Sequence, residues 1–212
     1  MNNYDKIAKH YDWLSQLVFS DTQVNAQKNQ LSHLKSNSNI LIVGGGTGWI
    51  LEEIAKIYPS GLNIVYVELS AKMISRSKAR NFNDNNVEFV NLAIENFESA
   101  YGFDFILTPF LFDNFKDEQA ELVFEKLNLL LNNNGKWFLV DFTLQHGSGK
   151  WWKSTLLKSM YLFFRLFKMI NTSELVEMKP YFLKRHYVLI EERFYYQNFI
   201  EASVYSKQND TF

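Results

Sequence analysis

The sequence predicts a doubly wound α/β fold in which a mostly parallel sheet of seven strands carries helices on both faces. Strand-like and helix-like segments alternate from about residue 38 onward, as they do in chains of βαβ units. The length of 212 residues suits one hydrophobic core, with or without a modest insertion. The composition, 47% hydrophobic and 21% charged, is close to that of average globular domains. We therefore expect a single domain over residues 1–212.

The first strand is predicted at residues 39–43, a short apolar run closed by Gly44-Gly45-Gly46. A continuous apolar run of this length suits a strand that is buried on both faces. Residues 47–57 then carry apolar side chains at helical spacing, and Pro59-Ser60-Gly61 breaks the pattern. This part of the chain is expected to form a strand, a glycine turn and a helix.

The remaining core elements follow the same alternation. Further strands are predicted at residues 62–67, 87–92, 103–107 and 136–141, and helices at 70–81 and 117–131. Ser70 is a plausible N-cap for the first of these helices. Asn132-Asn133-Asn134-Gly135 is expected to stop the second helix in a turn before the fifth strand.

Both ends of the chain add to this core. Residues 187–196 and 199–205, separated by Gln197-Asn198, predict an antiparallel pair on the sheet edge. Residues 4–34 look helical, with Ser20 or Asp21 as a cap. The predicted division is a helical cap (1–36), a core (37–145), a helical aromatic insertion (146–186) and a strand pair (187–212).

Composition excludes several function classes. The formal net charge of −1 gives no basic field for nucleic acid, so no nucleic-acid partner is predicted. The absence of cysteine excludes disulfides, thiolate metal sites and cysteine nucleophiles. Residues 1–10 lack the apolar core of a signal peptide, so we expect a cytoplasmic protein. No metal site is predicted, because no histidines are paired at metal-ligand spacing; the four are His10, His33, His146 and His186.

The sharpest motif is the glycine turn after the first strand, together with the acid after the second. Glycines allow a tight turn and a close approach of the backbone to a ligand, while the next helix offers free N–H groups. Glu68 ends the second strand, where an acid can accept hydrogen bonds from the two hydroxyls of a ribose. These residues predict a nucleoside-binding crevice at the carboxyl ends of the first two strands.

The spacing of the glycines separates two kinds of nucleoside. The dinucleotide fingerprint would place its third glycine at position 49, where this chain has Trp49. A large indole opposes the close helix–strand approach of that fold. A nicotinamide-dependent oxidoreductase is therefore the less favoured alternative.

The spacing instead resembles the class I S-adenosylmethionine-dependent methyltransferases, and the resemblance runs from about residue 4 to residue 205. It implies a Rossmann-like fold, S-adenosylmethionine as the cofactor, and residues 37–145 as the cofactor-binding core. By resemblance Gly44, Gly46 and Gly48, with Gly45 between them, form the first motif. Glu68 would hold the ribose, and Leu69 and Met73 would flank the adenine; all three stand in a segment similar to the family's second motif.

Further segments carry the same resemblance. Residues 87–95 resemble the third-strand motif, in which an aspartate often accepts from the adenine amino group; here Ala93 stands at that position, and the Ile94 backbone N–H could still reach the ring. Residues 103–108 look like the fourth strand, which would bring Thr108 to the cofactor. Residues 4–12 resemble the opening signature of small-molecule members, including the quinone-biosynthesis branch, and would close over the cofactor through Tyr11.

Methyl transfer needs a general base only when the acceptor must lose a proton. The candidates are Asp141, Asp113 and Tyr11, with Tyr4 as a further one. Asp141 either faces the substrate or caps the segment that follows at Thr143. Asp113 is either a substrate-side group or, by a slight preference, the N-cap of a helix that begins near Phe115.

Residues 149–170 hold five basic residues, many aromatic ones and no acid. Their charges recur too often for a bilayer-spanning helix, so an amphipathic helix fits better. Three interpretations stay open: a hydrophobic lid over the crevice, core packing with solvated lysines, and peripheral contact of residues 150–170 with an anionic membrane.

The function predicted from these patterns is transfer of a methyl group from S-adenosylmethionine to a small acceptor that is apolar or aromatic. The alternative from another class is a non-catalytic module that binds S-adenosylmethionine or S-adenosylhomocysteine. The sequence makes no prediction of oligomeric state.

Overall fold

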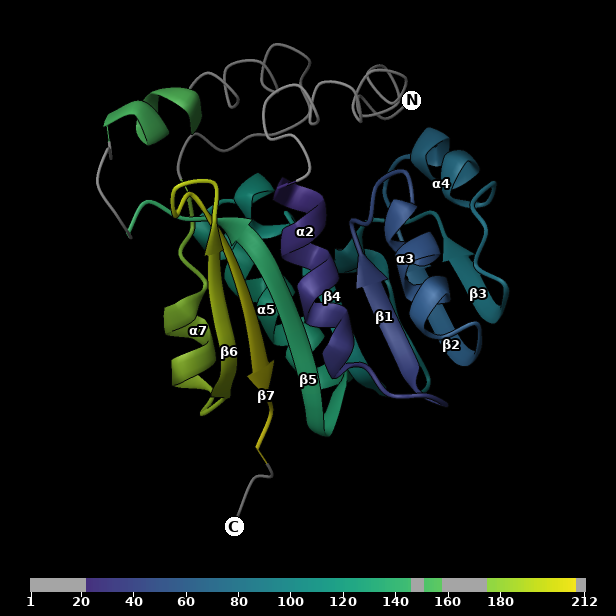
Figure 1. Cartoon of the computed structure of the whole chain (residues 1–212). Coiled ribbons are helices and arrows are strands. Elements are labelled where there is room, and N and C mark those ends of the chain that lie inside the picture. Colours follow the sequence, from purple (N-terminus) through teal and green to yellow (C-terminus); the bar gives the residue numbers. More distant parts are fainter. Residues whose placement is uncertain (1–21, 146–150, 158–174, 209–212) are drawn as a thin grey trace.

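A seven-stranded sheet forms the middle of the molecule in the computed structural model, which describes residues 22–145, 151–157 and 175–208 (Figure 1). The strands are β1 (Asn39–Val43), β2 (Ser60–Val67), β3 (Asp84–Val90), β4 (Phe103–Pro109), β5 (Leu131–Phe142), β6 (Val188–Tyr195) and β7 (Ile200–Ser206). The α-helices of the described residues include α2 (Thr22–Lys28), α3 (Trp49–Ile57), α4 (Ala71–Ser77), α5 (Asp117–Leu130) and α7 (Lys179–Lys184). Short 3₁₀ helices span Asn29–His33, Ile94–Asn96 and Phe112–Asn114.

The strand order is β3-β2-β1-β4-β5-β7-β6. Strands β1 to β5 pair in parallel, whereas β7 pairs antiparallel with both β5 and β6. Parallel neighbours need crossover connections, and these place helices on both faces of the sheet. The predicted doubly wound, mostly parallel, Rossmann-like fold with an antiparallel addition at one edge is confirmed.

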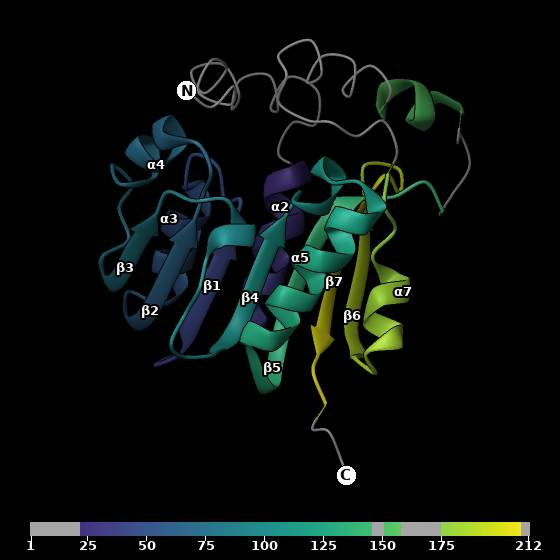
Figure 2. The same cartoon turned by 180° about the vertical axis from the view of Figure 1, so that it is seen from behind.

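Alternation along each strand divides the core into two layers. In β1, Ile40 and Ile42 pack on the face that carries α3, while Leu41 and Val43 pack on the face that carries α5. Figures 1 and 2, which view the sheet from opposite sides, show α2 and α3 in front of the sheet in one view and α5 in front in the other. Both faces of the central strands are therefore buried, as the unbroken apolar run in β1 predicted.

Aromatic side chains fill the layer under α5 and α7. Phe124 of α5 stacks on Trp137 of β5 with ring centroids 5.0 Å apart. Phe182 of α7 stacks on Tyr205 of β7 at 3.8 Å and meets Phe124 edge to face at 5.0 Å. These contacts fasten the antiparallel strands and α7 to the parallel part of the sheet.

One predicted turn is wrong, because β5 begins at Leu131, directly after α5, rather than at Lys136. Phe103 of β4 pairs with Leu131, and two residues later Phe105 pairs with Lys136, so the residues between bulge out of the strand. Asn134 adopts a φ of 61°, which asparagine tolerates better than most residues.

The helix after Ser70 begins as predicted and ends early. Ser70 is the N-cap, and its hydroxyl accepts from the Met73 backbone N–H at 3.2 Å. The helix stops at Ser77 rather than at residue 81. The chain continues in tighter i→i+3 hydrogen bonds, including one from the Arg80 N–H to the Ser77 carbonyl, and this bend carries Arg80 back toward the glycine turn.

Of the helical segment predicted before the sheet, only the part from residue 22 lies among the described residues, so Tyr4, Tyr11, Ser20 and Asp21 lie outside them. The described part is α2 and the 3₁₀ helix Asn29–His33. Within it, the buried amide of Gln30 donates to the carbonyls of Leu139 and Ser203, each at 3.0 Å. This segment is thus tied across β5 and β7.

Two parts of the predicted insertion at residues 146–186 are described: a helical segment at residues 151–157, and residues 175–186, which include α7. Trp152 packs edge to face on Phe199, and the fully buried Lys153 donates from Nζ to the Asn198 carbonyl at 3.2 Å. The segment therefore rests on the turn between β6 and β7. Residues 146–150 and 158–174 lie outside the described part, so the lid and membrane interpretations remain predictions.

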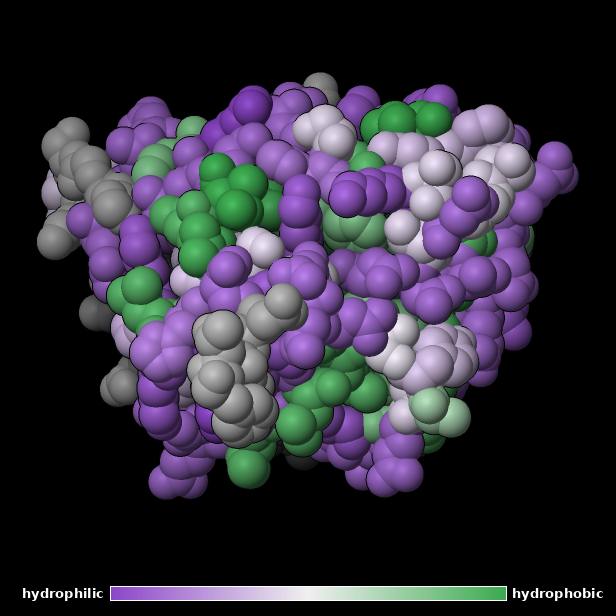
Figure 3. Space-filling view, turned by 90° about the horizontal axis from the view of Figure 1, so that it is seen from below, coloured by the Kyte–Doolittle hydropathy of each residue, from purple (hydrophilic) through white to green (hydrophobic). Residues whose placement is uncertain are grey.

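In the described part of the chain, no helix combines the length and apolar character needed to cross a bilayer. Seen from below, from the end opposite the carboxyl ends of the parallel strands, the surface is mostly hydrophilic with separate hydrophobic groups between (Figure 3). Scattered apolar groups of this kind are normal on a protein surface.

The aromatic layer leads to a prediction for stability. Replacing the fully buried Phe124 with alanine should lower the free energy of unfolding by about 3–5 kcal/mol, because a cavity opens between α5 and β5. Leu129→Ala on the same helix, where the side chain is 82% exposed, is the matched control and should change it by less than about 0.5 kcal/mol. Urea denaturation followed by circular dichroism measures both. Equal losses in the two variants would contradict this account of the core.

Candidate functional site

The glycine turn lies where β1 ends, at the edge of the sheet formed by the carboxyl ends of the parallel strands. The neighbours of β1 are β2 on one side and β4 on the other, so the strand order reverses at this point. Ligands of open α/β sheets bind in the crevice outside such a reversal point. The fold therefore sets the turn at the place where a ligand crevice is expected.

The glycines of the turn are required for two different reasons. Gly44, Gly46 and Gly48 have φ values of 72°, 64° and 78°, a region that side chains rarely adopt. At Gly45, an added Cβ would lie 2.5 Å from the Tyr66 hydroxyl oxygen. A Cβ on Gly46, by contrast, would meet no atom of the described residues within 4 Å, so among them the turn faces open space on that side.

Glu68 points at this turn. Its Oε2 accepts from the Gly46 backbone N–H at 3.1 Å, and its Oε1 accepts from the Ser70 N–H at 2.8 Å. The side chain is only 8% exposed, so these bonds fix its direction. The glycine turn and Glu68 were predicted to lie together, and the structure brings them together.

Residues that the sequence analysis missed hold this pair from beneath. The Tyr66 hydroxyl donates to the Gly46 carbonyl at 3.0 Å, and Arg80 Nε donates to the Thr47 carbonyl at 3.0 Å. The Ser77 hydroxyl donates to the Met73 carbonyl at 2.6 Å and makes a longer, shared contact with the Gly46 carbonyl at 3.3 Å. The available signal was a tyrosine among the aliphatic residues of a buried strand, because a buried hydroxyl needs a partner. Burial, together with the nearby charge of Glu68, raises the pKa of Tyr66 well above its usual value, which keeps the hydroxyl a donor.

The third strand also supports the acid-bearing segment. The side-chain amide of Asn91, directly after β3, donates to the carbonyls of Glu68 and Leu69, both at 2.9 Å. This bond ties the turn after β2 to the turn after β3. Asparagine side chains that bond to nearby backbone are typical of turns, but the spacing alone did not reveal the partner.

The other residues predicted to bind the cofactor have different surroundings. Leu69 is 46% exposed, whereas Met73 and Ile94 are buried. Thr108 does not reach the crevice. It is fully buried, and its hydroxyl accepts from Trp137 Nε1 at 2.9 Å, so it offers no surface to a ligand. Tyr11, predicted both for cofactor and for catalysis, lies outside the described residues.

Two predicted acids lie together at the carboxyl ends of β4 and β5. Asp141 ends β5, and its carboxylate accepts from the backbone N–H groups of Phe142 at 2.9 Å and Phe112 at 3.1 Å. Asp113 lies in the 3₁₀ helix after β4 and pairs with the side chain of Asn114. Both side chains are more than nine-tenths buried.

The two capping interpretations are wrong. Asp113 does not cap α5, because that helix begins at Asp117 behind Lys116, which makes no side-chain cap. Asp141 does not cap at Thr143, whose N–H donates to the Phe199 carbonyl instead. Its carboxylate holds the turn after β4 to the end of β5.

Burial dominates the electrostatics of this pair. It raises the pKa of Asp141 to about 7, although the backbone N–H groups of Phe142, Phe112 and Asp113 act in the opposite direction. The charge of Glu177 raises this pKa further. Burial, and next the charge of Asp141, raise the pKa of Asp113 well above its usual value. The pair thus holds protons at a pH where most carboxyl groups are ionised.

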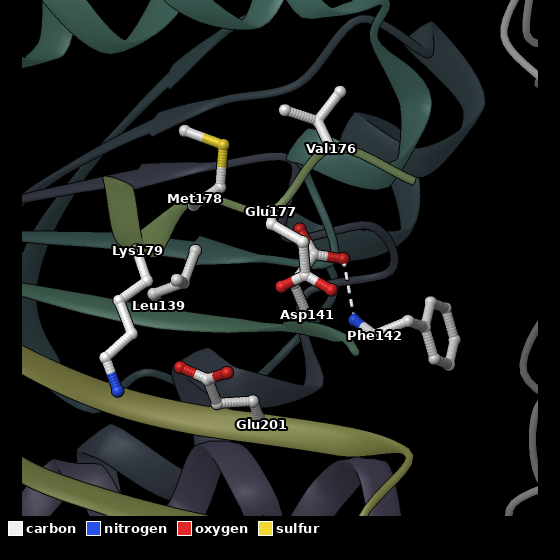
Figure 4. A pocket seen from close by; sticks show the side chains of 8 residues that line it. All are labelled: Leu139, Asp141, Phe142, Val176, Glu177, Met178, Lys179 and Glu201. Carbon is white, nitrogen blue, oxygen red and sulfur yellow. Dashed lines mark hydrogen bonds between the residues drawn. The ribbon is translucent and has the colours of Figure 1, made fainter. Parts of the chain in front are cut away.

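A narrow pocket opens beside Asp141 (Figure 4). Around it lie carboxylates from three parts of the chain: Asp141 of β5, Glu177 before α7, and Glu201 of β7. Asp141 and Glu201 are direct partners in the antiparallel register. The ammonium of Lys179, which also lines the pocket, pairs with Glu192 at 2.7 Å. Among the described residues, no group of three or more acids or histidines is placed to hold a metal ion.

Comparison with known proteins relates part of this chain to methyltransferases. Residues 40–135 match the family model of a methyltransferase domain. The malonyl-[acyl-carrier protein] O-methyltransferase of Acetivibrio thermocellus is 29% identical over 119 residues, which are 54% of this chain and 40% of that protein. This chain therefore matches less than half the length of that curated relative.

Solved structures share the fold at low sequence identity. The N-methyltransferase NodS of Bradyrhizobium japonicum with S-adenosylhomocysteine superposes with a TM-score of 0.63 at 14% identity, over 87% of this chain and 85% of that one. The 1,6-didemethyltoxoflavin-N1-methyltransferase of Burkholderia thailandensis, also with S-adenosylhomocysteine, gives 0.68 at 12% identity over 98% and 87%. Residues 40–135 thus match a methyltransferase domain, the fold is that of methyltransferases solved with S-adenosylhomocysteine, and the glycine turn and Glu68 stand at the crevice of this fold, with S-adenosylmethionine as the cofactor that these matches imply.

Proposed function

We propose that the protein transfers the methyl group of S-adenosylmethionine to a small acceptor with an apolar or aromatic body. The observation that carries this proposal is the meeting of the Gly46 N–H with the Glu68 carboxylate beside the open side of the turn. A nucleoside that lies there would contact both the backbone of the glycine turn and the Glu68 carboxylate, whose direction is fixed. The family match and the fold of the similar proteins support the same activity.

The cofactor residues follow from this placement. Both oxygens of an ionised carboxylate are acceptors, so Glu68 is of the chemical type that accepts hydrogen bonds from the two ribose hydroxyls. The turn from Gly44 to Gly48 lets the backbone approach the ligand closely. Leu69, exposed beside Glu68, and Met73 would flank the adenine, and the Ile94 N–H would face its edge.

Bound S-adenosylmethionine would supply an electrophilic methyl group for attack in line with the methyl–sulfur bond, with S-adenosylhomocysteine as the leaving group. The protein must hold the acceptor atom in that line and keep water away. The carboxyl ends of β4 and β5 are the place where this chain concentrates buried polar groups, with Asp113 and Asp141 side by side in the fold. We place the acceptor there.

Asp141 is the proposed base for acceptors that lose a proton. A base works best when its pKa lies near the operating pH, and burial brings the pKa of Asp141 to about 7. Asp113, whose pKa is also raised, would keep a proton beside it. An acceptor nitrogen or carbon that has no proton to lose needs only positioning.

Thermal shift and calorimetry test the cofactor proposal. S-adenosylmethionine and S-adenosylhomocysteine should each stabilise the protein, and NADH should not. Glu68→Ala should weaken S-adenosylhomocysteine binding about 10- to 100-fold, because hydrogen bonds to a charged group contribute about 1.5–3 kcal/mol. Glu98→Ala, which removes an exposed acid, is the control and should bind normally. If neither sulfonium cofactor nor its product stabilises the wild type, or if NADH binds more tightly, the proposal is wrong.

A second prediction concerns Asp141. In protein labelled at the aspartate carboxyl carbons, one NMR signal should titrate near pH 7, and Asp141→Asn should remove it. Since the pKa is raised on folding, the native state binds the extra proton. The free energy of unfolding should therefore fall as the pH rises from about 4 to 7, and this fall should be smaller in Asp141→Asn. Titration of every aspartate below pH 5 would contradict both the buried pair and its role as a base.

A further inference from the structure

Two side-chain hydroxyls converge on one backbone carbonyl underneath the glycine turn. Tyr66 lies on β2, two residues before Glu68, and its hydroxyl donates to the Gly46 carbonyl at 3.0 Å. Ser77, the last residue of α4, shares its one hydroxyl hydrogen between the Met73 carbonyl at 2.6 Å and this same oxygen at 3.3 Å, so its support of Gly46 is the weaker of the two. The N–H of Gly46 faces the other way, to Glu68. Both peptide units that flank Gly46 are therefore held by side chains.

Gly46 needs this support more than another residue would. Glycine populates positive and negative φ about equally, so its own chemistry does not select the observed φ of 64°. A Cβ at this position would meet nothing within 4 Å in the described part of the chain, so packing against those residues does not select this φ either. The hydrogen bonds at its two ends are what select this conformation, and with it the direction of the N–H that meets Glu68.

The Tyr66 hydroxyl acts through the turn and does not touch a ligand. Its side chain is fully buried, and a Cβ on Gly45 would lie 2.5 Å from its oxygen, so the backbone covers it. Its raised pKa keeps it protonated over the physiological range, which preserves its role as donor. Arg80 extends the same support by one residue, through the Thr47 carbonyl.

We propose that Tyr66, assisted by Ser77, is a positioning residue for the cofactor: it fixes the peptide units around Gly46, and through them aims the Glu68 carboxylate at the ribose. The inference rests on the proposed function of the crevice. A rigid acceptor loses less freedom when it binds, so the hidden hydroxyl contributes affinity without contacting the ligand. Because the ribose is common to the ligands, the effect is the same for S-adenosylmethionine, S-adenosylhomocysteine and adenosine.

The test compares two deletions of a tyrosine hydroxyl. Tyr66→Phe removes the donor beneath the turn. Tyr58→Phe removes a hydroxyl that donates to the Leu34 carbonyl at 2.7 Å, after the end of α3, and serves as the matched control. The two changes should lower the melting temperature by similar amounts, because each removes one hydrogen bond to a backbone carbonyl.

Calorimetry on the full chain then separates positioning from stability. Tyr66→Phe should raise the Kd for S-adenosylhomocysteine and for S-adenosylmethionine by the same factor, about 3- to 10-fold, while Tyr58→Phe leaves both unchanged. Ser77→Ala should weaken binding in the same direction, which keeps the test decisive if Tyr66→Phe does not fold. Wild-type affinity in a folded Tyr66→Phe variant, or equal losses in Tyr66→Phe and Tyr58→Phe, would overturn the positioning role alone. Failure of the wild type to bind S-adenosylhomocysteine would overturn the proposed function and this inference together.

Discussion

The hydrogen bond between the Gly46 N–H and the Glu68 carboxylate joins the end of β1 to the end of β2, and the rest of the site is arranged around it. The parallel register makes it feasible, because Val43 pairs with Val67 and both strands end at the same level. The Gly44 N–H continues the ladder to the Val67 carbonyl, and the Glu68 N–H continues it to the Val90 carbonyl of β3. Three strand ends are thus fixed before any side chain takes part. The acid then has one direction in which to point.

The two halves of the sheet are supported by different physics. Around β1 and β2 the backbone itself forms the site, held by hydroxyl, amide and guanidinium donors on neighbouring elements. Around β5 and β7 the support on one face is an aromatic layer. Asp141 and Glu201 stand directly opposite each other there, an arrangement that would be unfavourable for two charges. The raised pKa of Asp141 reduces the repulsion between these two carboxyl groups, because Asp141 can remain protonated near neutral pH.

Periodicity and glycine placement predicted the elements well, and local chemistry predicted their ends less well. The NILIV run and the turn after it match β1 and Gly44 to Gly48, because burial on both faces leaves few alternatives for such a segment. The asparagine run after α5 was expected to form a turn, and it forms a bulge within β5 instead. Asn132 donates to Asp104 of β4 at 3.0 Å, a tertiary bond that no local pattern encodes.

The site shows the same division between local and tertiary information. The pairing of the glycine turn with Glu68 could be predicted, because strand topology alone brings those ends together. The partners of Asp113 and Asp141 could not, since they depend on how the turn after β4 folds over the end of β5. Tyr66 was overlooked because a single hydroxyl inside an apolar strand has no spacing to mark it.

The burial of Lys153 has a consequence for how the end of the chain influences the insertion. Its ammonium reaches the Asn198 carbonyl from a place without exposure to water, within a turn where Tyr196, Gln197 and Asn198 all have positive φ. Burial of a cation is costly unless it keeps such a partner, so Lys153 holds the segment at residues 151–157 to the hairpin. The shape of the connection between the last two strands thereby sets where this segment is held, and lengthening or relaxing that connection would move its anchoring point.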